Sequence, residues 1–166
     1  FKLITSMAAI DEIPDIESRT FTCNGSENFG GTSVTCEKAH GRISFEEALN
    51  VSCNCAFAEI ATELGSSVMK KYVKKAGLTN SYSINGLETK PSTFDFTSDG
   101  EAGLAWSGVG QGNDLVNPAS LMIFCGAVAN EGKAAVPQII SYTAFRQGVR
   151  YSIYIKHSTD ELIKPK

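Results

Sequence analysis

SFEEALNVSCNCAFA, residues 44–58, is the stretch that decides the fold. Ser44 and Glu47 match a capping box, in which the serine oxygen accepts from the third amide of a helix and the glutamate reaches back. Apolar residues then follow at helical spacing as far as Gly65, which is suited to end a helix. The polar Ser-Cys-Asn run interrupts this stripe, and its Asn54 is suited to cap a second helix. The stretch therefore predicts two helices with a tight joint between them.

Further helices are expected on both sides of this pair. Residues 2–10 carry apolar side chains at helical spacing, and Pro14 then breaks the pattern. Residues 66–76 are expected to form a helix that ends before Gly77, and the lysines of this helix are expected to form a solvated face. The Asn-Pro pair at 117–118 is typical of a helix start, and the apolar residues 119–129 continue it.

The segments between these helices are rich in glycine and small polar residues. Residues 15–41 and 77–116 show little periodicity, so we predict that both are mostly loop. Strands are expected only near the end of the chain, where apolar and polar residues alternate over 149–156. A turn at Gln147-Gly148 would pair this strand with residues 139–145.

These elements predict a mainly α protein with a small β part. We expect one domain, with a helical lobe over about 1–133 and a strand or hairpin tail over about 134–166. No internal repeat is visible.

The composition is that of an ordinary globular protein, with 42% hydrophobic and 20% charged residues. A net charge of −3 provides no basic face, so no nucleic-acid partner is expected. The longest apolar run, residues 121–129, is less than half of a membrane span, and we expect no membrane segment. The chain has no initiator Met and opens inside a predicted helix, so we expect it to be a piece of a longer protein.

Five cysteines are an odd number, so at least one thiol has no partner within the chain. Cys23 and Cys36 bracket a loop-like stretch and could form a disulfide in an oxidising compartment, or remain two small buried thiols. A zinc site built from the cysteines and His40 is a poor match, because no Cys-x-x-Cys pair occurs. We predict no metal and no cofactor.

Few other residues suggest catalysis. His40 and His157 have no Ser or Cys pattern beside them, so we interpret both as surface or loop residues. The glycine run at 108–112 lacks the spacing of a dinucleotide loop and the lysine of a P-loop, and is interpreted as a turn. Two polar features remain: Lys2 at the head of an apolar helix, and the Ser-Cys-Asn run at 52–54. A lysine stem packed on apolar surface and a capped helix joint would explain them structurally.

Several segments together resemble the transpeptidase domain of penicillin-binding proteins. FKLI and SMAA, residues 1–4 and 6–9, resemble the segment after that family's active-site serine, where a Ser-x-x-Lys motif opens a buried helix. AHG at 39–41 and ALNVSCNCAFA at 48–58 resemble the region of its second motif, Ser-x-Asn. Further matches in the family's order are GQG at 110–112, Asn117-Pro118, ANEG at 129–132 and Pro137.

The resemblance implies a serine acyl-enzyme and a role for each matching residue. Lys2 would take the proton from the serine hydroxyl, and Ser52 would help to pass it to the leaving D-alanine amine. Asn54 would bind the substrate's peptide amide and steady Lys2. The substrate would be the D-alanyl-D-alanine end of a peptidoglycan stem peptide, and β-lactam antibiotics would acylate the same serine. Cys23 and Cys36 resemble a cysteine pair of some Gram-positive members.

The family's nucleophilic serine would lie two residues before Phe1, and no Lys-Thr-Gly or Lys-Ser-Gly motif occurs in the chain. We therefore expect the helical lobe of the β-lactamase/transpeptidase-like fold, lacking most of its sheet. The chain alone would be inactive, and its exposed apolar surface would favour self-association. The parent protein is expected outside the cytoplasm, anchored in the bacterial cytoplasmic membrane.

Three alternatives to the transpeptidase share this fold. Asn54 argues against a β-lactam sensor domain, since valine is usual at that position in the sensor and oxacillinase branch. The Ala-His-Gly and Gly-Gln-Gly context argues against a serine β-lactamase. A catalytically inert scaffold stays open, because the nucleophile is outside the sequence.

Overall fold

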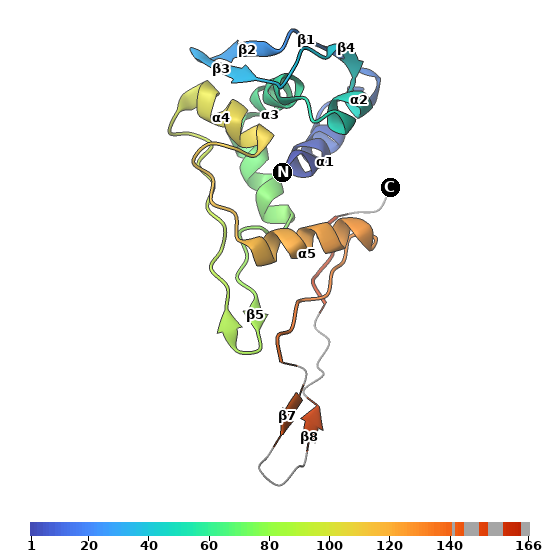
Figure 1. Ribbon diagram of the computed structural model, residues 1–166, viewed down its shortest axis with the longest axis vertical. Helices are drawn as coiled ribbons and strands as arrows, with labels where there is room; N and C mark the ends of the chain where they lie inside the picture. The colour runs from blue at the N-terminus through green and yellow to red at the C-terminus, as the bar shows by residue number, and fades with distance from the viewer. Residues whose placement is uncertain (141, 145–149, 153–157, 164–166) are drawn as a thin grey trace. The chain divides into compact units, whose positions relative to one another are not determined.

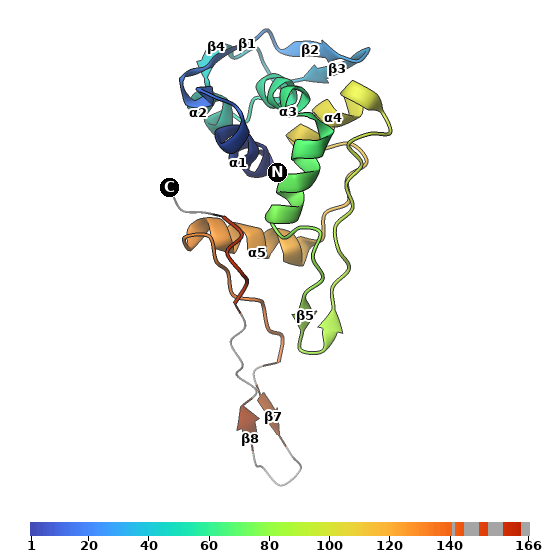
Figure 2. The same ribbon diagram turned by 180° about the vertical axis from the view of Figure 1, so that it is seen from behind.

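The computed structural model describes residues 1–140, 142–144, 150–152 and 158–163. The chain divides into two compact units, each built from two segments. Unit 1 comprises residues 1–73 and 93–115, and unit 2 comprises residues 74–92 and 116–166. The elements are shown from opposite sides in Figures 1 and 2.

Unit 1 contains α1 (Lys2–Glu12), α2 (Phe45–Asn50), most of α3 (Asn54–Lys75) and α4 (Gly100–Val109). The predicted capping box at the start of α2 is confirmed. The Ser44 hydroxyl accepts from the backbone N–H of Glu47 at 3.1 Å, and the Glu47 carboxylate accepts from the N–H of Ser44 at 2.8 Å. These bonds satisfy backbone donors that the first turn would leave free, and they fix where α2 begins.

The predicted joint between α2 and α3 is also confirmed, since α2 ends at Asn50 and α3 begins at Asn54. The prediction that the Asn54 side chain caps α3 is wrong, because this side chain bonds to groups outside the helix. Gly65 interrupts α3 with φ of 77°. Glycine adopts this left-handed conformation at little cost, because it has no Cβ atom. Two helices therefore meet at Gly65, which confirms the predicted stop there and the helix predicted over 66–76.

The prediction that residues 15–41 are mostly loop, with strands only near the end of the chain, is wrong. The segment contains a 3₁₀ turn, Ile16–Ser18. Together with residues 42–44 it forms two small antiparallel sheets. In these sheets β1 (Thr20–Cys23) pairs with β4 (Gly41–Ser44), and β2 (Ser26–Phe29) pairs with β3 (Thr32–Thr35). Each strand has four residues and buries at most two of them, so the alternation is too short to detect in the sequence.

The prediction of loop over 77–116 missed α4 and a small hairpin, in which β5 (Ser83–Ile84) pairs with β6 (Leu87–Glu88). Three glycines lower the helix propensity of α4, which hides it in the sequence. A Cβ atom at Gly108 would overlap the Cβ of Ala61 and lie 3.2 Å from the carbonyl oxygen of Phe57. The glycine therefore allows α4 to pack directly on α3.

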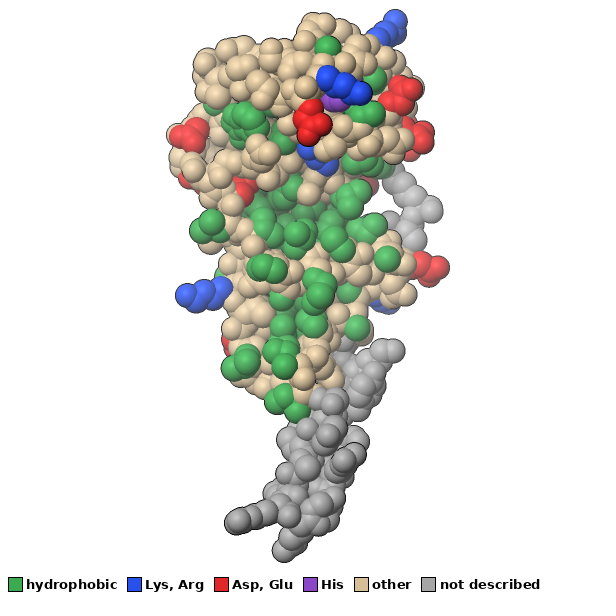
Figure 3. Space-filling model, viewed as in Figure 1, with side chains coloured by type: hydrophobic (Ala, Val, Ile, Leu, Met, Phe, Trp, Pro, Cys, Tyr) green, Lys and Arg blue, Asp and Glu red, His purple; other side chains and the backbone are tan. Residues whose placement is uncertain are grey.

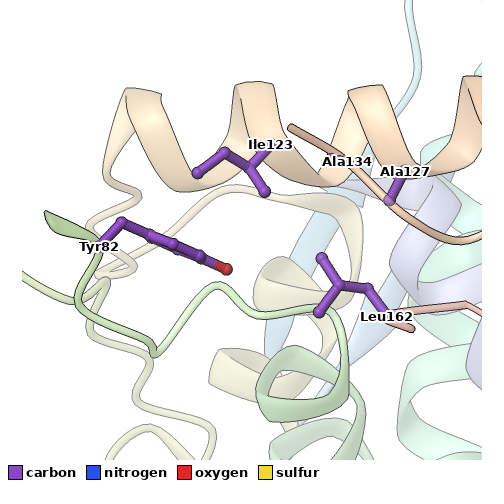
Figure 4. Packing of buried hydrophobic residues seen from close by; sticks show 5 residues of the cluster. All are labelled: Tyr82, Ile123, Ala127, Ala134 and Leu162. Carbon is purple, nitrogen blue, oxygen red and sulfur yellow. The ribbon is translucent and has the colours of Figure 1, made fainter. Parts of the chain in front are cut away.

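Unit 2 contains α5 (Pro118–Ala129), which begins as predicted. The Asn117 side chain accepts from the backbone N–H groups of Ala119 at 2.8 Å and Ser120 at 3.4 Å. Figure 4 shows the buried cluster beneath the helix, in which aliphatic side chains and one tyrosine come together. Its members are Tyr82, Ile123, Ala127, Ala134 and Leu162.

The predicted terminal hairpin is confirmed for the residues that the structure describes. β7 (Tyr142–Ala144) pairs antiparallel with β8 (Arg150–Ser152), with Thr143 opposite Tyr151. Residues 139 and 140, the start of the first predicted strand, belong to no strand. The predicted turn at Gln147-Gly148, residues 141, 145, 149 and 153–156 of the predicted strands, and His157 lie outside the described residues. The chain is mainly α with small two-stranded sheets, as predicted. The prediction of one domain divided near residue 133 stays a prediction.

Candidate active site

Lys2 stands in the first turn of α1, a helix whose inner face is buried. Its Nζ donates to Oδ1 of Asn54 at 2.9 Å and lies 5.9 Å from the centre of the Phe57 ring. These contacts come from the start of α3, fifty-two residues away in sequence. Two of the residues singled out from the sequence are thus in direct contact.

The Asn54 side chain has a fixed orientation. Its Nδ2 donates to the carbonyl oxygen of Thr35 at 2.8 Å, so its Oδ1 is the atom that faces the ammonium of Lys2. The backbone N–H of Asn54 donates to Sγ of Cys36 at 3.1 Å. The strand β3 and the residue after it therefore position Asn54, and Asn54 positions Lys2.

Half-burial lowers the pKa of Lys2 from its ordinary value of 10.5, while Coulomb attraction to the thiol groups of Cys36 and Cys53 opposes this shift. A lowered pKa increases the fraction of neutral amine, the form that accepts a proton. The site therefore has a lysine that is both held in place and better suited than a solvated lysine to act as a base.

Ser52 lies in the joint between α2 and α3. The N–H of Cys53 bonds to the carbonyl of Ala48 at 2.8 Å, and the N–H of Ser52 bonds to that of Leu49 at 3.1 Å. This pattern is a Schellman motif, and Ser52 occupies its left-handed position with φ of 53°, where glycine is usual. Its side chain is exposed, and within the described residues its hydroxyl makes no hydrogen bond. A serine at this position carries a conformational cost that a glycine would avoid.

The cysteines meet in a way that sequence reasoning missed. The Sγ atom of Cys36 lies 3.7 Å from that of Cys23, 3.8 Å from that of Cys53 and 3.6 Å from that of Cys55. All four are free thiols, as is the exposed Cys125 in unit 2. A disulfide would need an S–S distance of about 2.05 Å. The disulfide between Cys23 and Cys36 stays a prediction.

The neighbouring thiols differ in acidity. Burial opposes ionisation of Cys23, but hydrogen bonds from the backbone of His40 and Gly25 and from the other thiols lower its pKa to about 6. Burial raises the pKa of Cys53 to about 12, and it also raises that of Cys55. Cys23 therefore ionises more readily than Cys53 and Cys55.

Two further interpretations from the sequence need correction. His40 does lie in a loop, between β3 and β4, but it is only partly exposed, because its Nδ1 is buried and the residue belongs to the group of cysteines. The glycine run is a turn only in its second part: Gly110 ends α4 with φ of 94°, whereas Gly108 lies within the helix. The carbonyl of Gly108 accepts from the Thr5 hydroxyl at 2.7 Å, which ties α4 to α1 beside Lys2.

The sequence matches the family model of the penicillin-binding protein transpeptidase domain over residues 1–164. Stage V sporulation protein D of Bacillus subtilis is 29% identical over 143 residues, which cover 84% of this chain and 22% of that protein. Peptidoglycan D,D-transpeptidase PbpA of Mycolicibacterium smegmatis is 30% identical over 114 residues, or 69% of this chain and 22% of that protein. The chain thus spans less than a quarter of the length of these relatives.

A solved structure shares the fold. Penicillin-binding protein A of Mycobacterium tuberculosis, as its penicillin G acyl-enzyme complex, superposes with a TM-score of 0.83 at 19% identity. The superposition covers 98% of this chain and 39% of that one.

Proposed function

The chain belongs to the penicillin-binding protein transpeptidase family, and on this premise we propose that it supplies the proton-transfer side of a serine acyl-transfer site that cross-links peptidoglycan. The nucleophile would be a serine two residues before Phe1 in the full-length protein. The 166 residues by themselves would then form no covalent adduct.

In this mechanism Lys2 acts as the general base. Its neutral amine accepts the serine hydroxyl proton while the serine oxygen attacks the carbonyl carbon of the penultimate D-alanine. Half-burial supports this role, because it favours the neutral amine that must receive the proton. The bond to Asn54 Oδ1 keeps Nζ in one place, which reduces the entropy lost in reaching the reactive arrangement.

Ser52 and Asn54 would complete the proton path and the substrate contacts. The exposed Ser52 hydroxyl would relay the proton to the departing D-alanine amine, so that the C–N bond breaks and the acyl-enzyme remains. The amine of a second stem peptide would then attack the ester, releasing the serine and forming the cross-link. Asn54 would hold Lys2 in place and would also form a hydrogen bond with the amide of the stem peptide. A β-lactam would open its ring on the same serine.

One observation carries the proposal: the contact between Lys2 and an Asn54 whose orientation is set by the carbonyl of Thr35. A lysine whose stem merely packs on apolar surface would place its ammonium in water and would need no such partner.

A fluorescent penicillin tests the proposal on the full-length protein. We expect a stable adduct, mapped by mass spectrometry to the serine two residues before Phe1, and loss of labelling when Ser52 is changed to alanine. The 166-residue chain should give no adduct. A folded full-length protein that gives none would support an inert scaffold instead. Adduct formation without any transpeptidation of stem peptides would support a β-lactam sensor.

None of the helices in the described part of the chain is both long and apolar enough to cross a bilayer. We propose that the full-length protein acts outside the cytoplasm, where its substrate lies, and is anchored in the cytoplasmic membrane. Protease treatment of intact spheroplasts should degrade it, whereas a cytoplasmic protein would be protected.

We also propose that the isolated chain self-associates. Hydrophobic side chains gather over α5 on the face shown in Figure 3, and Leu121, Met122 and Val128 of this helix are exposed. Contiguous apolar surface of this kind tends to be covered by another protein surface. Sedimentation velocity should show dimers or larger species that Met122→Lys shifts toward monomer; a monomeric wild-type chain would contradict the proposal.

A further inference from the structure

Three cysteines and a histidine converge at the joint between α2 and α3. The ligand atoms of Cys23, Cys36, His40 and Cys53 all lie within 4.8 Å of one another. Among the described residues, no other group of three or more potential ligands forms such a cluster. The four residues come from the end of β1, the segment between β3 and β4, and the helix joint. The fold therefore assembles the group from segments that are far apart in sequence.

The distances fit a tetrahedral metal site. Zinc binds thiolate sulfur at about 2.3 Å, and the tetrahedral angle then separates two sulfur ligands by about 3.8 Å. The Sγ atom of Cys36 lies 3.7 Å from that of Cys23 and 3.8 Å from that of Cys53. These separations match the edges of such a tetrahedron and are well beyond the disulfide bond length of about 2.05 Å.

His40 supplies an independent observation. Its Nδ1 is buried and, within the described residues, has no hydrogen-bond partner. A buried polar atom without a partner destabilises the fold, so such atoms usually have a ligand or an ordered water. The imidazole of His40 also offers a ring nitrogen within 4.8 Å of the three sulfur atoms, so the ring lies where a metal ion among them could bind it.

We propose that Cys23, Cys36, Cys53 and His40 bind one zinc ion. Three thiolates and one imidazole are a typical ligand set of closed structural zinc sites, and soft sulfur ligands exclude magnesium and calcium. Binding replaces each thiol S–H bond with an S–Zn bond and releases the proton to solvent. No oxidant takes part. The proposal departs from the expectation of no metal, which rested on the missing Cys-x-x-Cys pair.

The zinc would position the catalytic residues. Cys53 lies between Ser52 and Asn54, so a bond from its sulfur to the metal would hold the whole joint. Cys36 accepts from the backbone N–H of Asn54 at 3.1 Å, so a second ligand is already tied to the same residue. The metal would thus connect the strands β1 and β3 to the side chain that holds Lys2.

The test is the metal content of the full-length protein, purified without chelator and without a metal-affinity tag. We expect about one zinc per chain by mass spectrometry of the metal, and tetrahedral thiolate absorption when cobalt replaces it. Changing a ligand, as in Cys36→Ser or His40→Ala, should weaken zinc binding at least about 100-fold. Cys55→Ala and Cys125→Ala are matched controls and should retain one zinc, because neither residue belongs to the group.

If a ligand variant fails to fold, the wild-type protein provides a second test. A chelator should lower its melting temperature, and added zinc, but not magnesium, should restore it. This readout does not depend on acylation, so it separates the zinc proposal from the proposed function. A folded wild-type protein without zinc, whether its thiols are free or Cys23 is disulfide-bonded to Cys36, would overturn the proposal.

Discussion

The two units of the chain differ in the kinds of side chain that they bury. Unit 1 holds the candidate catalytic residues and the group of thiols, and several of its polar side chains are partly or wholly buried in contact with one another. Unit 2 has a core of aliphatic side chains and one tyrosine, and its helix α5 exposes three large apolar residues to solvent. The candidate catalytic residues are therefore concentrated in unit 1, and unit 2 contributes an apolar core and exposed apolar surface.

Two asparagines near helix starts show what this difference means. Asn117 in unit 2 caps its own helix, so its role depends only on the residues beside it in sequence. Asn54 in unit 1 bonds to Lys2 and to Thr35, both distant in sequence. Local bonds define an element, whereas long-range bonds position a functional group.

The largest expected effect is on the acylation rate, which should depend on a lysine of unit 1 but not on a lysine of unit 2. Lys2→Met in the full-length protein should slow acylation by penicillin about 1,000-fold, because the serine loses its general base. Lys133→Met changes an exposed lysine of unit 2 and should leave the rate unchanged. Stopped-flow measurement of acylation would decide the matter. An unchanged rate in the Lys2 variant would mean that another group accepts the proton.

Packing should distinguish two helical glycines. Gly108→Ala in unit 1 forces Cβ into Ala61, and we expect the free energy of unfolding to fall by about 3 kcal/mol. Gly126→Ala in unit 2 places the new Cβ atom 3.4 Å from the Cβ of Ala134, an ordinary contact. This change should raise the free energy of unfolding by about 0.5 kcal/mol, because alanine lowers the backbone entropy of the unfolded chain. Urea denaturation measures both. Equal effects would mean that α4 can move away from α3.

The two asparagines should differ in what their loss impairs. Asn54→Ala removes a hydrogen bond to a charged group, worth about 2 kcal/mol, and should slow acylation about thirtyfold. Asn117→Ala removes a helix cap and should lower stability by about 1 kcal/mol while acylation is kept. Rates and denaturation curves of both variants are needed. The distinction between the units fails if Asn117→Ala slows acylation as much as Asn54→Ala does.

The smallest expected effect concerns Ser52. Ser52→Gly should raise the free energy of unfolding by up to about 1 kcal/mol, because glycine adopts a φ of 53° without the same cost. Acylation should fall nonetheless, since the hydroxyl is lost. Ser52→Ala is the control, with the same loss of the hydroxyl and no gain in stability. A Gly variant less stable than the Ala variant would show that the joint does not need the left-handed conformation.

The helices α1 to α3 and the start of α5 followed from local sequence patterns, whereas the strands β1 to β4 and the helix α4 did not. The capping box at Ser44 and Glu47, the cap at Asn117 and the break at Gly65 each depend on a few adjacent residues. The importance of Lys2 and Asn54 was inferred from family resemblance, and the structure places them in contact. The local pattern assigned Asn54 to a helix cap, and it could not show the contact with Thr35, because that partner lies elsewhere in the chain.

The sequence by itself determined where α2 and α5 begin, because helix capping is set by neighbours within about four residues. Only the tertiary structure decided that β1 pairs with β4 and β2 with β3, that α4 packs on α3 through Gly108, and that three cysteines and His40 come together. Each of these depends on contacts between distant segments. Such contacts form only when the folded chain buries enough apolar surface to offset the loss of its conformational entropy.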